Sequence, residues 1–213
     1  MMYAAEREAV VDVCHALLDQ KLVVGTAGNV SVRIGDHVVI SPSGVDYRKM
    51  RAEHVVVVDI DGNVVQGSLK PSSELPLHLA VYTTSAHQAI VHTHAVASTA
   101  LSVVVDEIPL SHYYSAMFGG PVRVAAYATY GSEQLALNVQ AALVGRTAAL
   151  MANHGAVSVA ATLAKALDQL PYLEYICELQ LTAMSTGRDI KLLSTDEIEH
   201  VASMLGSYGQ KTD

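Results

Sequence analysis

The sequence has no tryptophan, one phenylalanine and two cysteines, but ten tyrosines and ten histidines in 213 residues. Cys14 and Cys177 are too few and too far apart for the disulfide framework of a small secreted domain. We therefore expect free thiols in a reducing cytoplasm. The shortage of Phe and Trp predicts a core made of aliphatic side chains.

Charged residues are also scarce, at 16% against 51% hydrophobic residues, which excludes an intrinsically disordered chain and a solvated coiled coil. The 13 Lys and Arg against 21 Asp and Glu give a net charge of −8 and no basic stripe, so nucleic acid is not an expected partner. Polar residues interrupt every apolar stretch before it reaches about 18 residues, so no segment is expected to span a membrane. The charged start, with Glu6, Arg7 and Glu8, is unlike a signal peptide, and a cytoplasmic protein is expected.

The pattern of apolar residues predicts one α/β domain over residues 1–213, with three α/β/α layers around a largely antiparallel central sheet. Gly35-Asp36 and Asp61-Gly62 are hairpin signals between short apolar strands. Pro171 falls inside the longest predicted helix and should kink or interrupt it. Helices are expected over 4–20, 74–83 (with Ser72 as its cap), 95–101, 132–143, 162–186 and from 195. Strands are expected over 29–33, 38–40, 55–59, 64–65, 89–93, 122–126, 148–151 and 156–159.

The tripeptide His92-Thr93-His94 is the most informative motif. Residues two apart on a strand face the same side, so the two imidazoles should point at one location. An isolated pair of this kind is more often structural. Here His154 follows another apolar strand and precedes Gly155, which should allow a tight turn. Three histidines at strand ends are typical of a catalytic metal site with one open position, and we favour that interpretation.

Ser72-Ser73-Glu74 places an acid at the start of a predicted helix. Alone, this segment would be read as a capping sequence and nothing more. Beside a divalent metal, the Glu74 carboxylate could be a fourth ligand in the empty enzyme, or a base that moves away when substrate arrives.

Two further turns are rich in small residues, amides and hydroxyls: Gly25 to Asn29 and Ser41 to Gly44. Such turns bind phosphate without Lys or Arg, although each one alone is more often a plain turn. Together with the Ser72-Ser73 turn, they favour a phosphate cradle in the first half of the chain.

The remaining histidines, apart from His78 and His112, are interpreted as surface or hydrogen-bonded structural side chains. His78 lies four residues after Glu74 on the same helix face, so it is expected near the site. Tyr113 and Tyr114 follow His112. A tyrosine hydroxyl can transfer protons, but spacing alone favours packing for both.

Eight motifs in order along the chain resemble the class II, metal-dependent aldolases of the L-fuculose-1-phosphate aldolase type. Their superfamily also holds L-ribulose-5-phosphate 4-epimerase and the adducin head domain. The motifs are GTAGNVSVR, SPSG, KPSSELPLH, VHTHAVAS, IPLSHYYSAMFGG, ATYGS, NHG and SYG, and the resemblance covers essentially the whole chain. It implies reversible cleavage of a ketose 1-phosphate to dihydroxyacetone phosphate and a small aldehyde such as L-lactaldehyde.

The resemblance also implies roles for individual residues. Glu74 would ligate the resting metal and act as acid and base at the donor carbon. Tyr113 would act across a subunit interface as proton donor or acceptor for the aldehyde oxygen, and Tyr208 would close over substrate from a mobile tail. The family builds four-fold symmetric tetramers with sites between subunits, so a homotetramer is expected. The implied metal ligands are His92, His94 and His154, with Zn2+ expected and Co2+, Mn2+ or Fe2+ compatible; the implied phosphate cradle is Thr26, Gly28, Asn29, Ser43, Gly44, Ser72 and Ser73.

Three other functions of the superfamily remain as alternatives. The epimerases resemble KPSG and SSD where this chain has Ser41 before Pro42 and Glu74 after Ser73, and both differences favour the aldolase. A decarboxylase of 3-oxo sugar-acid phosphates would keep the same histidines and the Ser-Ser-Glu segment. A non-catalytic interaction domain, as in adducin, is disfavoured because all three histidines and Glu74 are present.

Overall fold

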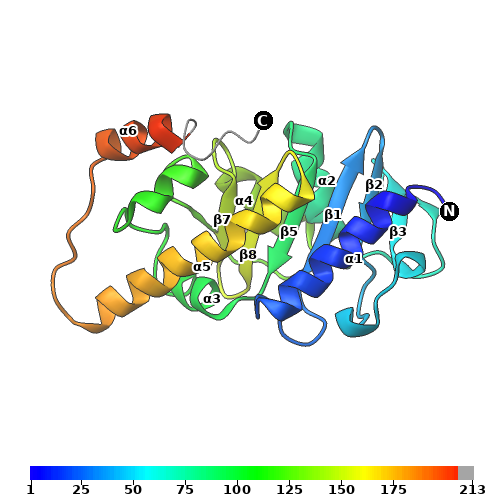
Figure 1. The fold of residues 1–213 in the computed structure, drawn as a ribbon, viewed down its shortest axis with the longest axis horizontal. Coiled ribbons are helices and arrows are strands. Elements are labelled where there is room, and N and C mark those ends of the chain that lie inside the picture. Colours follow the sequence, from blue (N-terminus) through cyan, green and yellow to red (C-terminus); the bar gives the residue numbers. More distant parts are fainter. Residues whose placement is uncertain (206–213) are drawn as a thin grey trace, which may run out of the picture.

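The computed structural model describes residues 1–205 and shows a single mixed sheet of eight strands between two layers of helices (Figure 1). The strands lie in the order β4-β3-β2-β1-β5-β8-β7-β6. All neighbouring pairs are antiparallel except β6 and β7, which are parallel. The three-layer α/β/α fold with a largely antiparallel sheet is therefore confirmed. The strands are β1 (Asn29–Ile34), β2 (His37–Ile40), β3 (Val56–Asp59), β4 (Val64–Gln66), β5 (Ala89–Thr93), β6 (Val124–Ala125), β7 (Ala148–Met151) and β8 (Gly155–Ala160).

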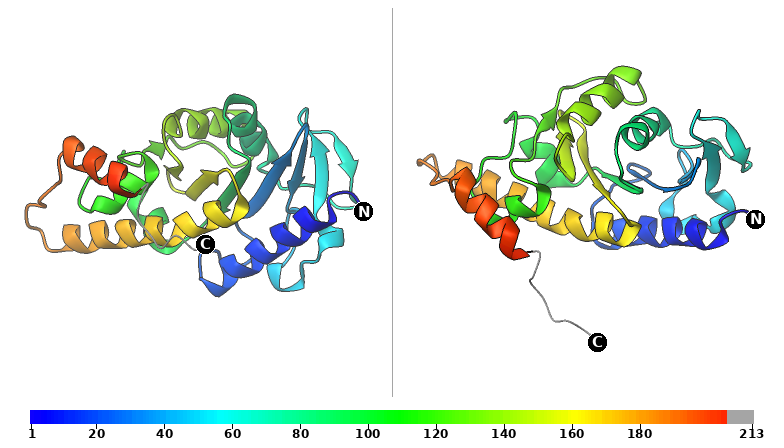
Figure 2. Two further views of the ribbon diagram at one scale, coloured as in Figure 1. Left: turned by 45° about the horizontal axis from the view of Figure 1, so that its top comes forward. Right: turned by 90° about the horizontal axis from the view of Figure 1, so that it is seen from above.

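Two groups of helices cover the two faces of the sheet (Figure 2). The face below the sheet in the right-hand view is covered by α1 (Ala4–Asp19), α3 (Val96–Leu101) and α5 (Leu163–Ser185). The opposite face is covered by α2 (Leu75–Thr84) and α4 (Glu133–Ala142). Each face buries its own cluster of side chains because successive residues of a strand point to opposite sides.

The core is aliphatic, as the composition predicts. Tyr47, Tyr82 and Phe118 are the aromatic side chains among the largest fully buried ones in the described part of the chain. Val, Leu, Ile and Ala make up most of the rest. Both cysteines are buried free thiols. Within residues 1–205 no helix combines the length and the apolar character that a membrane crossing needs.

The helix α5 differs from expectation at Pro171, since it is continuous from Leu163 to Ser185. A proline inside a helix removes one backbone hydrogen bond and crowds the preceding turn, which costs about 3 kcal/mol. The helix buries Ala166 and Leu170 before the proline and Leu173 and Ile176 after it. Packing of both halves on the sheet outweighs the local penalty, so Pro171 does not interrupt the helix, and a kink there stays a prediction.

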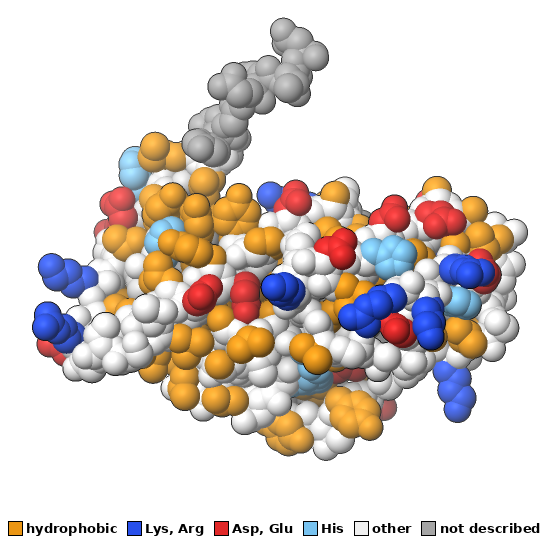
Figure 3. Space-filling view, turned by 60° about the horizontal axis from the view of Figure 1, so that its bottom comes forward, with side chains coloured by type: hydrophobic (Ala, Val, Ile, Leu, Met, Phe, Trp, Pro, Cys, Tyr) orange, Lys and Arg blue, Asp and Glu red, His pale blue; other side chains and the backbone are white. Residues whose placement is uncertain are grey.

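The last helix, α6 (Thr195–Leu205), lies at one end of the molecule against the short 3-10 helix η3 (Tyr113–Phe118). Figure 3 shows hydrophobic side chains gathered at this end. The expected helix from Thr195 is confirmed, and the predicted tail residue Tyr208 lies outside the described residues.

Candidate active site

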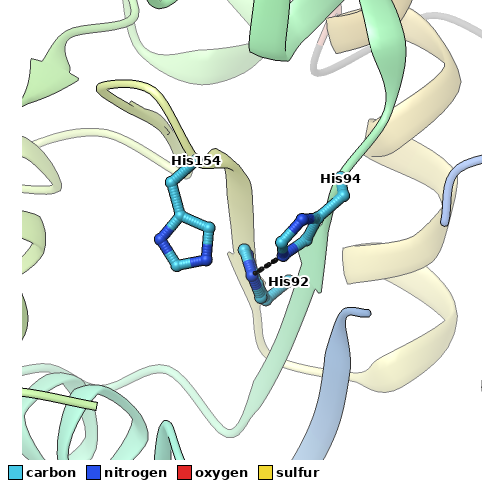
Figure 4. A group of neighbouring side chains, drawn as sticks. All are labelled: His92, His94 and His154. Atoms are coloured by element: carbon cyan, nitrogen blue, oxygen red, sulfur yellow. Dashed lines mark hydrogen bonds between the residues drawn. The ribbon is translucent and has the colours of Figure 1, made fainter. Parts of the chain in front are cut away.

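Three histidines from two neighbouring strand ends converge on one point (Figure 4). His92 lies in β5, His94 follows its end, and His154 lies in the turn between β7 and β8. Their possible ligand atoms all lie within 4.8 Å of one another, and the Nε2 atoms of His92 and His94 are 2.9 Å apart. The structure thus brings together the three residues that the sequence singles out.

The backbone around His154 explains how it reaches the other two. Asn153 adopts a left-handed conformation with φ 58°, which Asn tolerates better than most residues. Gly155 has no left-handed φ; its role is close approach, because a Cβ there would lie 2.1 Å from the carbonyl oxygen of Thr93. The expected tight turn is present at residues 152–154, but its left-handed residue is Asn153, whereas Gly155 lets β8 pack tightly against β5 next to His92.

The tautomer of His92 follows from one contact. Its Nδ1 lies 2.9 Å from the carbonyl oxygen of Ala156, which can only accept, so Nδ1 carries the proton. In the neutral ring, Nε2 is then a bare lone pair directed at His94 and at Oε2 of Glu74, 3.1 Å away. A lone pair facing a carboxylate needs a cation, either a proton or a metal ion. Burial by itself lowers the pKa of His92, but the charge of Glu74 raises it above its ordinary value.

Glu74 supplies the carboxylate of the site. It occupies the N-cap position of α2, yet its side chain does not cap the helix and is directed at the histidines. Burial would raise its pKa, but the interactions with the His92 and His154 rings and the hydrogen bond from Asn29 hold the pKa well below its usual range. The expectation that Ser72 caps the helix is wrong, since the N-cap residue is Glu74. The Ser72 hydroxyl accepts a hydrogen bond from the Glu74 backbone N–H at 3.2 Å.

The other two histidines stay neutral. The pKa of His94 is lowered to about 4 by burial and by the neighbouring His92 and His154, and the pKa of His154 is lowered by burial and by His92. Oε1 of Glu74 is buried without a hydrogen-bond partner and lies 3.5 Å from Nε2 of His154. Neutral imidazoles with a carboxylate that has an unpaired oxygen are a suitable donor set for a divalent transition metal.

A cavity of 380 Å³ opens beside this cluster, a volume typical of small-ligand sites. All seven residues of the predicted phosphate cradle line it. The turns that carry them are held together by backbone hydrogen bonds from Ser43 to Lys70 and from Ser72 to Ser41. The predicted lining residues are Thr26, Gly28, Asn29, Ser43, Gly44, Ser72, Ser73, Glu74, His94 and His154.

Two cradle residues have specific constraints. Gly28 has φ +83°, and a Cβ there would lie 2.8 Å from the carbonyl oxygen of His92, so the turn of the predicted cradle contacts the backbone of the histidine cluster. The Asn29 side chain is 4% exposed and donates to Oε2 of Glu74 at 2.8 Å. Its amide group is therefore bound to the carboxylate, which the sequence does not predict.

Tyr127, Ala128, Tyr130 and Asn153 also line the cavity and were missed as site residues. Tyr127 and Tyr130 are 63% and 69% exposed at its edge. A signal was present in the ATYGS motif: a Cβ at Gly131 would lie 2.7 Å from the carbonyl oxygen of Ser73, so this loop packs directly on the cradle.

Tyr113 lies elsewhere. It is 44% exposed and lines a separate pocket with residues of η3, α5 and α6, and none of the cradle residues line that pocket. In the described part of a single chain, Tyr113 therefore lies apart from His92, His94 and His154.

The α/β/α fold, the three histidines with Glu74, and the hydroxyl-rich turns together are the arrangement expected of an enzyme that uses a metal ion on a small phosphorylated substrate. Residues 8–181 match the family described as Class II Aldolase and Adducin N-terminal domain, and the chain belongs to this family. It is 37% identical over 206 residues to the L-fuculose phosphate aldolase of Escherichia coli (strain K12), covering 96% of this chain and 95% of that protein.

Two further comparisons support membership of this family. The chain is 36% identical over 214 residues to the 5-deoxy-D-ribulose 1-phosphate aldolase of Bacillus thuringiensis serovar kurstaki, covering 99% and 100% of the two chains. The solved structure of an L-fuculose 1-phosphate aldolase matches with a TM-score of 0.93 at 36% identity, covering 97% and 98%. The protein is a class II aldolase, a metal-dependent carbon–carbon lyase.

Proposed function

We propose that this aldolase cleaves a ketose 1-phosphate resembling L-fuculose 1-phosphate into dihydroxyacetone phosphate and a small aldehyde such as L-lactaldehyde. The observation that carries the proposal is the single cavity in which the histidine cluster, Glu74 and the hydroxyl-rich turns meet. The similarity to L-fuculose phosphate aldolase over 96% of the chain supports the choice of sugar.

His92, His94 and His154 would hold the metal ion, with Glu74 as a further ligand before substrate binds. Zn2+ is the expected ion, and Co2+, Mn2+ or Fe2+ suit similar ligands. The bound ion supplies Lewis-acid stabilisation of negative charge on the substrate oxygens.

The residues of the chain would divide the remaining work. The cradle amides and hydroxyls bind the phosphate, which orients the donor half. Glu74 gives a proton to the donor carbon after the carbon–carbon bond breaks, and takes it back in the reverse direction. Tyr113 of a neighbouring copy would accept the proton of the hydroxyl that becomes the aldehyde, and Tyr208 would close over the substrate.

Such a division requires an oligomer, for which we propose a homotetramer with sites between subunits. The support is the position of Tyr113, half exposed and in a pocket separate from the metal cluster of its own chain. Light scattering combined with size-exclusion chromatography measures the mass directly, and a monomer with full activity would contradict the shared site.

A panel of substrates tests the reaction itself. We expect L-fuculose 1-phosphate to release dihydroxyacetone phosphate, measured with a coupled reductase, in a reaction that stops when a chelator removes the metal. The 5-deoxy-D-ribulose 1-phosphate aldolase relative makes 5-deoxy-D-ribulose 1-phosphate the second candidate substrate, with the same donor half and another aldehyde. Faster cleavage of that substrate would select the second candidate.

The same panel separates the other reactions of the superfamily. Conversion of L-ribulose 5-phosphate without fragment release would indicate an epimerase. Carbon dioxide release from a 3-oxo sugar-acid phosphate would indicate a decarboxylase. Either result, with no dihydroxyacetone phosphate from any ketose 1-phosphate, would overturn the proposed function.

A further inference from the structure

Behind Glu74 a chain of buried polar side chains connects α2 to β1. Tyr82 Oη lies 2.7 Å from Ser31 Oγ, which lies 2.6 Å from His78 Nδ1. His78 Nε2 lies 2.5 Å from Asn29 Oδ1, and Asn29 Nδ2 lies 2.8 Å from Glu74 Oε2. Every member is at most 5% exposed, and the chain reaches the cavity only at its Asn29 and Glu74 end.

The arrangement follows from two periodicities. Glu74, His78 and Tyr82 are four residues apart and share one face of α2. Asn29 and Ser31 are two residues apart on β1 and point to the same side of the sheet. One helix face therefore meets one strand face along a line of alternating polar groups.

The carboxylate fixes the direction of every hydrogen bond in this chain. An ionised Glu74 only accepts, so Asn29 must present its NH2 group to Glu74 and its oxygen to His78. His78 then donates from Nε2 and accepts at Nδ1 from the Ser31 hydroxyl, which in turn accepts from Tyr82. Complete burial lowers the pKa of His78 to about 3, in keeping with a neutral ring that has one fixed tautomer.

This network gives the two carboxylate oxygens of Glu74 different hydrogen bonding. Oε2 accepts from Asn29, whereas Oε1 is buried without a hydrogen-bond partner beside His154. Building on the proposed function of Glu74 as acid and base, we propose that His78 is a positioning residue that acts through Asn29 to fix Oε2, so that Oε1 can ligate the metal before substrate binds and transfer the proton afterwards. In that transfer Oε1 takes the proton of the donor C–H bond, the electron pair stays on the donor fragment, and the proton returns along the same route.

The proton exchange of dihydroxyacetone phosphate in D2O tests this role, because NMR follows it without any aldehyde. His78→Phe removes both ring nitrogens, and we expect the exchange rate to fall roughly 10- to 100-fold, the usual effect of losing a group that orients a metal-site residue. We expect one metal per chain to remain, held by the three histidines, and the KM for dihydroxyacetone phosphate to change little. His78→Gln keeps an N–H donor near the Nε2 position and should recover most of the rate.

A matched control separates positioning from general loss of stability. Gln169 is 3% exposed and forms a similar buried network, accepting from Thr147 at 2.6 Å and donating to Ser158 at 3.2 Å, away from the cavity. Gln169→Leu should lower the melting temperature yet leave the exchange rate within about twofold. An equal loss of exchange in the two variants would overturn the proposal.

A double-mutant cycle with Glu74→Gln distinguishes this inference from the proposed function. If His78 acts through Glu74, His78→Phe should cause no further loss of exchange in the Glu74→Gln background. A full further loss would overturn the positioning role while leaving Glu74 in the mechanism. Wild-type exchange in Glu74→Gln alone would remove Glu74 from the mechanism itself.

Ser31→Ala keeps the test decisive if His78→Phe does not fold. It removes one hydroxyl and adds no volume, leaving Nδ1 of His78 without its partner. We expect a severalfold lower exchange rate that disappears in the Glu74→Gln background. Wild-type exchange in Ser31→Ala would then refute the proposal.

Discussion

The histidine cavity and the tyrosine cluster are built in opposite ways. In the cavity His92 is fully buried, Glu74 is 5% exposed, and both have polar partners within the chain. The tyrosine cluster consists of His112, Tyr113, Tyr114, Tyr172 and Tyr175, whose rings contact one another, mostly edge to face, at centroid distances of 4.4 to 5.8 Å. Tyr113, Tyr172 and Tyr175 are 39% to 47% exposed, beside a 600 Å³ pocket that α6 helps to line.

Within one chain, the histidines, Glu74 and the turns of the predicted cradle lie around one cavity. Its floor is buried at His92, Asn29 and Glu74, whereas the cradle residues Ser43 and Ser73 are exposed in its wall. The tyrosine cluster presents aromatic rings on the surface and lines a separate pocket, which agrees with the proposal that its partner belongs to another copy. The following experiments compare the two regions, from the largest expected effect to the smallest.

His94→Ala should abolish stoichiometric metal binding and lower the cleavage rate about a thousandfold, the effect of losing several kcal/mol of charge stabilisation. Metal content is measured by mass spectrometry of the purified protein. Tyr113→Phe is the matched change in the tyrosine cluster and should keep one metal per chain. A His94→Ala variant that still holds one metal per chain would contradict the role of His94.

Glu74→Gln and Tyr113→Phe should each lower the cleavage rate about a hundredfold, as expected for loss of one general acid or base. Only Glu74→Gln should lose the proton exchange of dihydroxyacetone phosphate. If the site is shared between copies, refolding the two variants together should restore part of the cleavage rate, because some sites then contain neither substitution. No recovery in a mixed oligomer that contains both chains would contradict a shared site.

The metal-free protein should lose stability as the pH falls below the ordinary His value of 6.5, since folding holds the pKa of His78 at about 3. Between these two pH values the unfolded chain binds a proton at His78 and the folded chain does not. The free energy of unfolding is therefore at its full value above pH 6.5 and declines as the pH falls towards 3. At pH 5 the loss is about 2 kcal/mol. His78→Gln should therefore show a smaller fall in melting temperature between pH 7 and 5, measured by calorimetry.

His112→Gln is the control for that titration in the tyrosine cluster. Burial lowers the pKa of His112 too, but its ring is only partly covered, so its removal should change the pH dependence less. If both variants reduced the pH dependence of the melting temperature equally, the burial of His78 would not be the main cause of the loss of stability in acid.

Ser73→Ala should raise the KM for the phosphorylated substrate about tenfold with little change in kcat, because one hydrogen bond to a charged group is worth about 1.4 kcal/mol or more. The Ser73 side chain is exposed in the cavity wall, so stability should not change. Tyr175→Phe in the tyrosine cluster should leave this KM unchanged. A lower kcat with unchanged KM would place Ser73 outside the phosphate cradle.

Local rules predict much of the site. His92 and His94 converge because a strand has a period of two, and His78 lies below Glu74 because a helix repeats about every four residues. The small-residue turns that share amide and hydroxyl donors line one cavity, and their binding of phosphate stays a prediction. Most predicted helices and strands agree with the structure within two residues at each end, since their apolar periodicity is clear.

Contacts between distant segments were not predictable in the same way. The pairing of Asn29 with His92 across β1 and β5 brings the Asn29 amide to Glu74, and no local pattern encodes that pairing. Tyr127 and Tyr130 reach the cavity because Gly131 packs on Ser73. In α5 packing on the sheet keeps the helix continuous through Pro171, so the interruption that the local rule allows does not occur.

The sequence by itself determined the kinds of group available: three imidazoles, one carboxylate and several hydroxyl-rich turns, with no need for a basic composition. It also determined the aliphatic core, through its lack of Phe and Trp. Only the tertiary structure decided that Asn29 binds Glu74 instead of remaining free, that Oε1 is unpaired, and that Tyr113 lies apart from the histidines. The reason is physical: periodicity fixes which face a side chain occupies, whereas strand pairing and helix packing fix what that face meets.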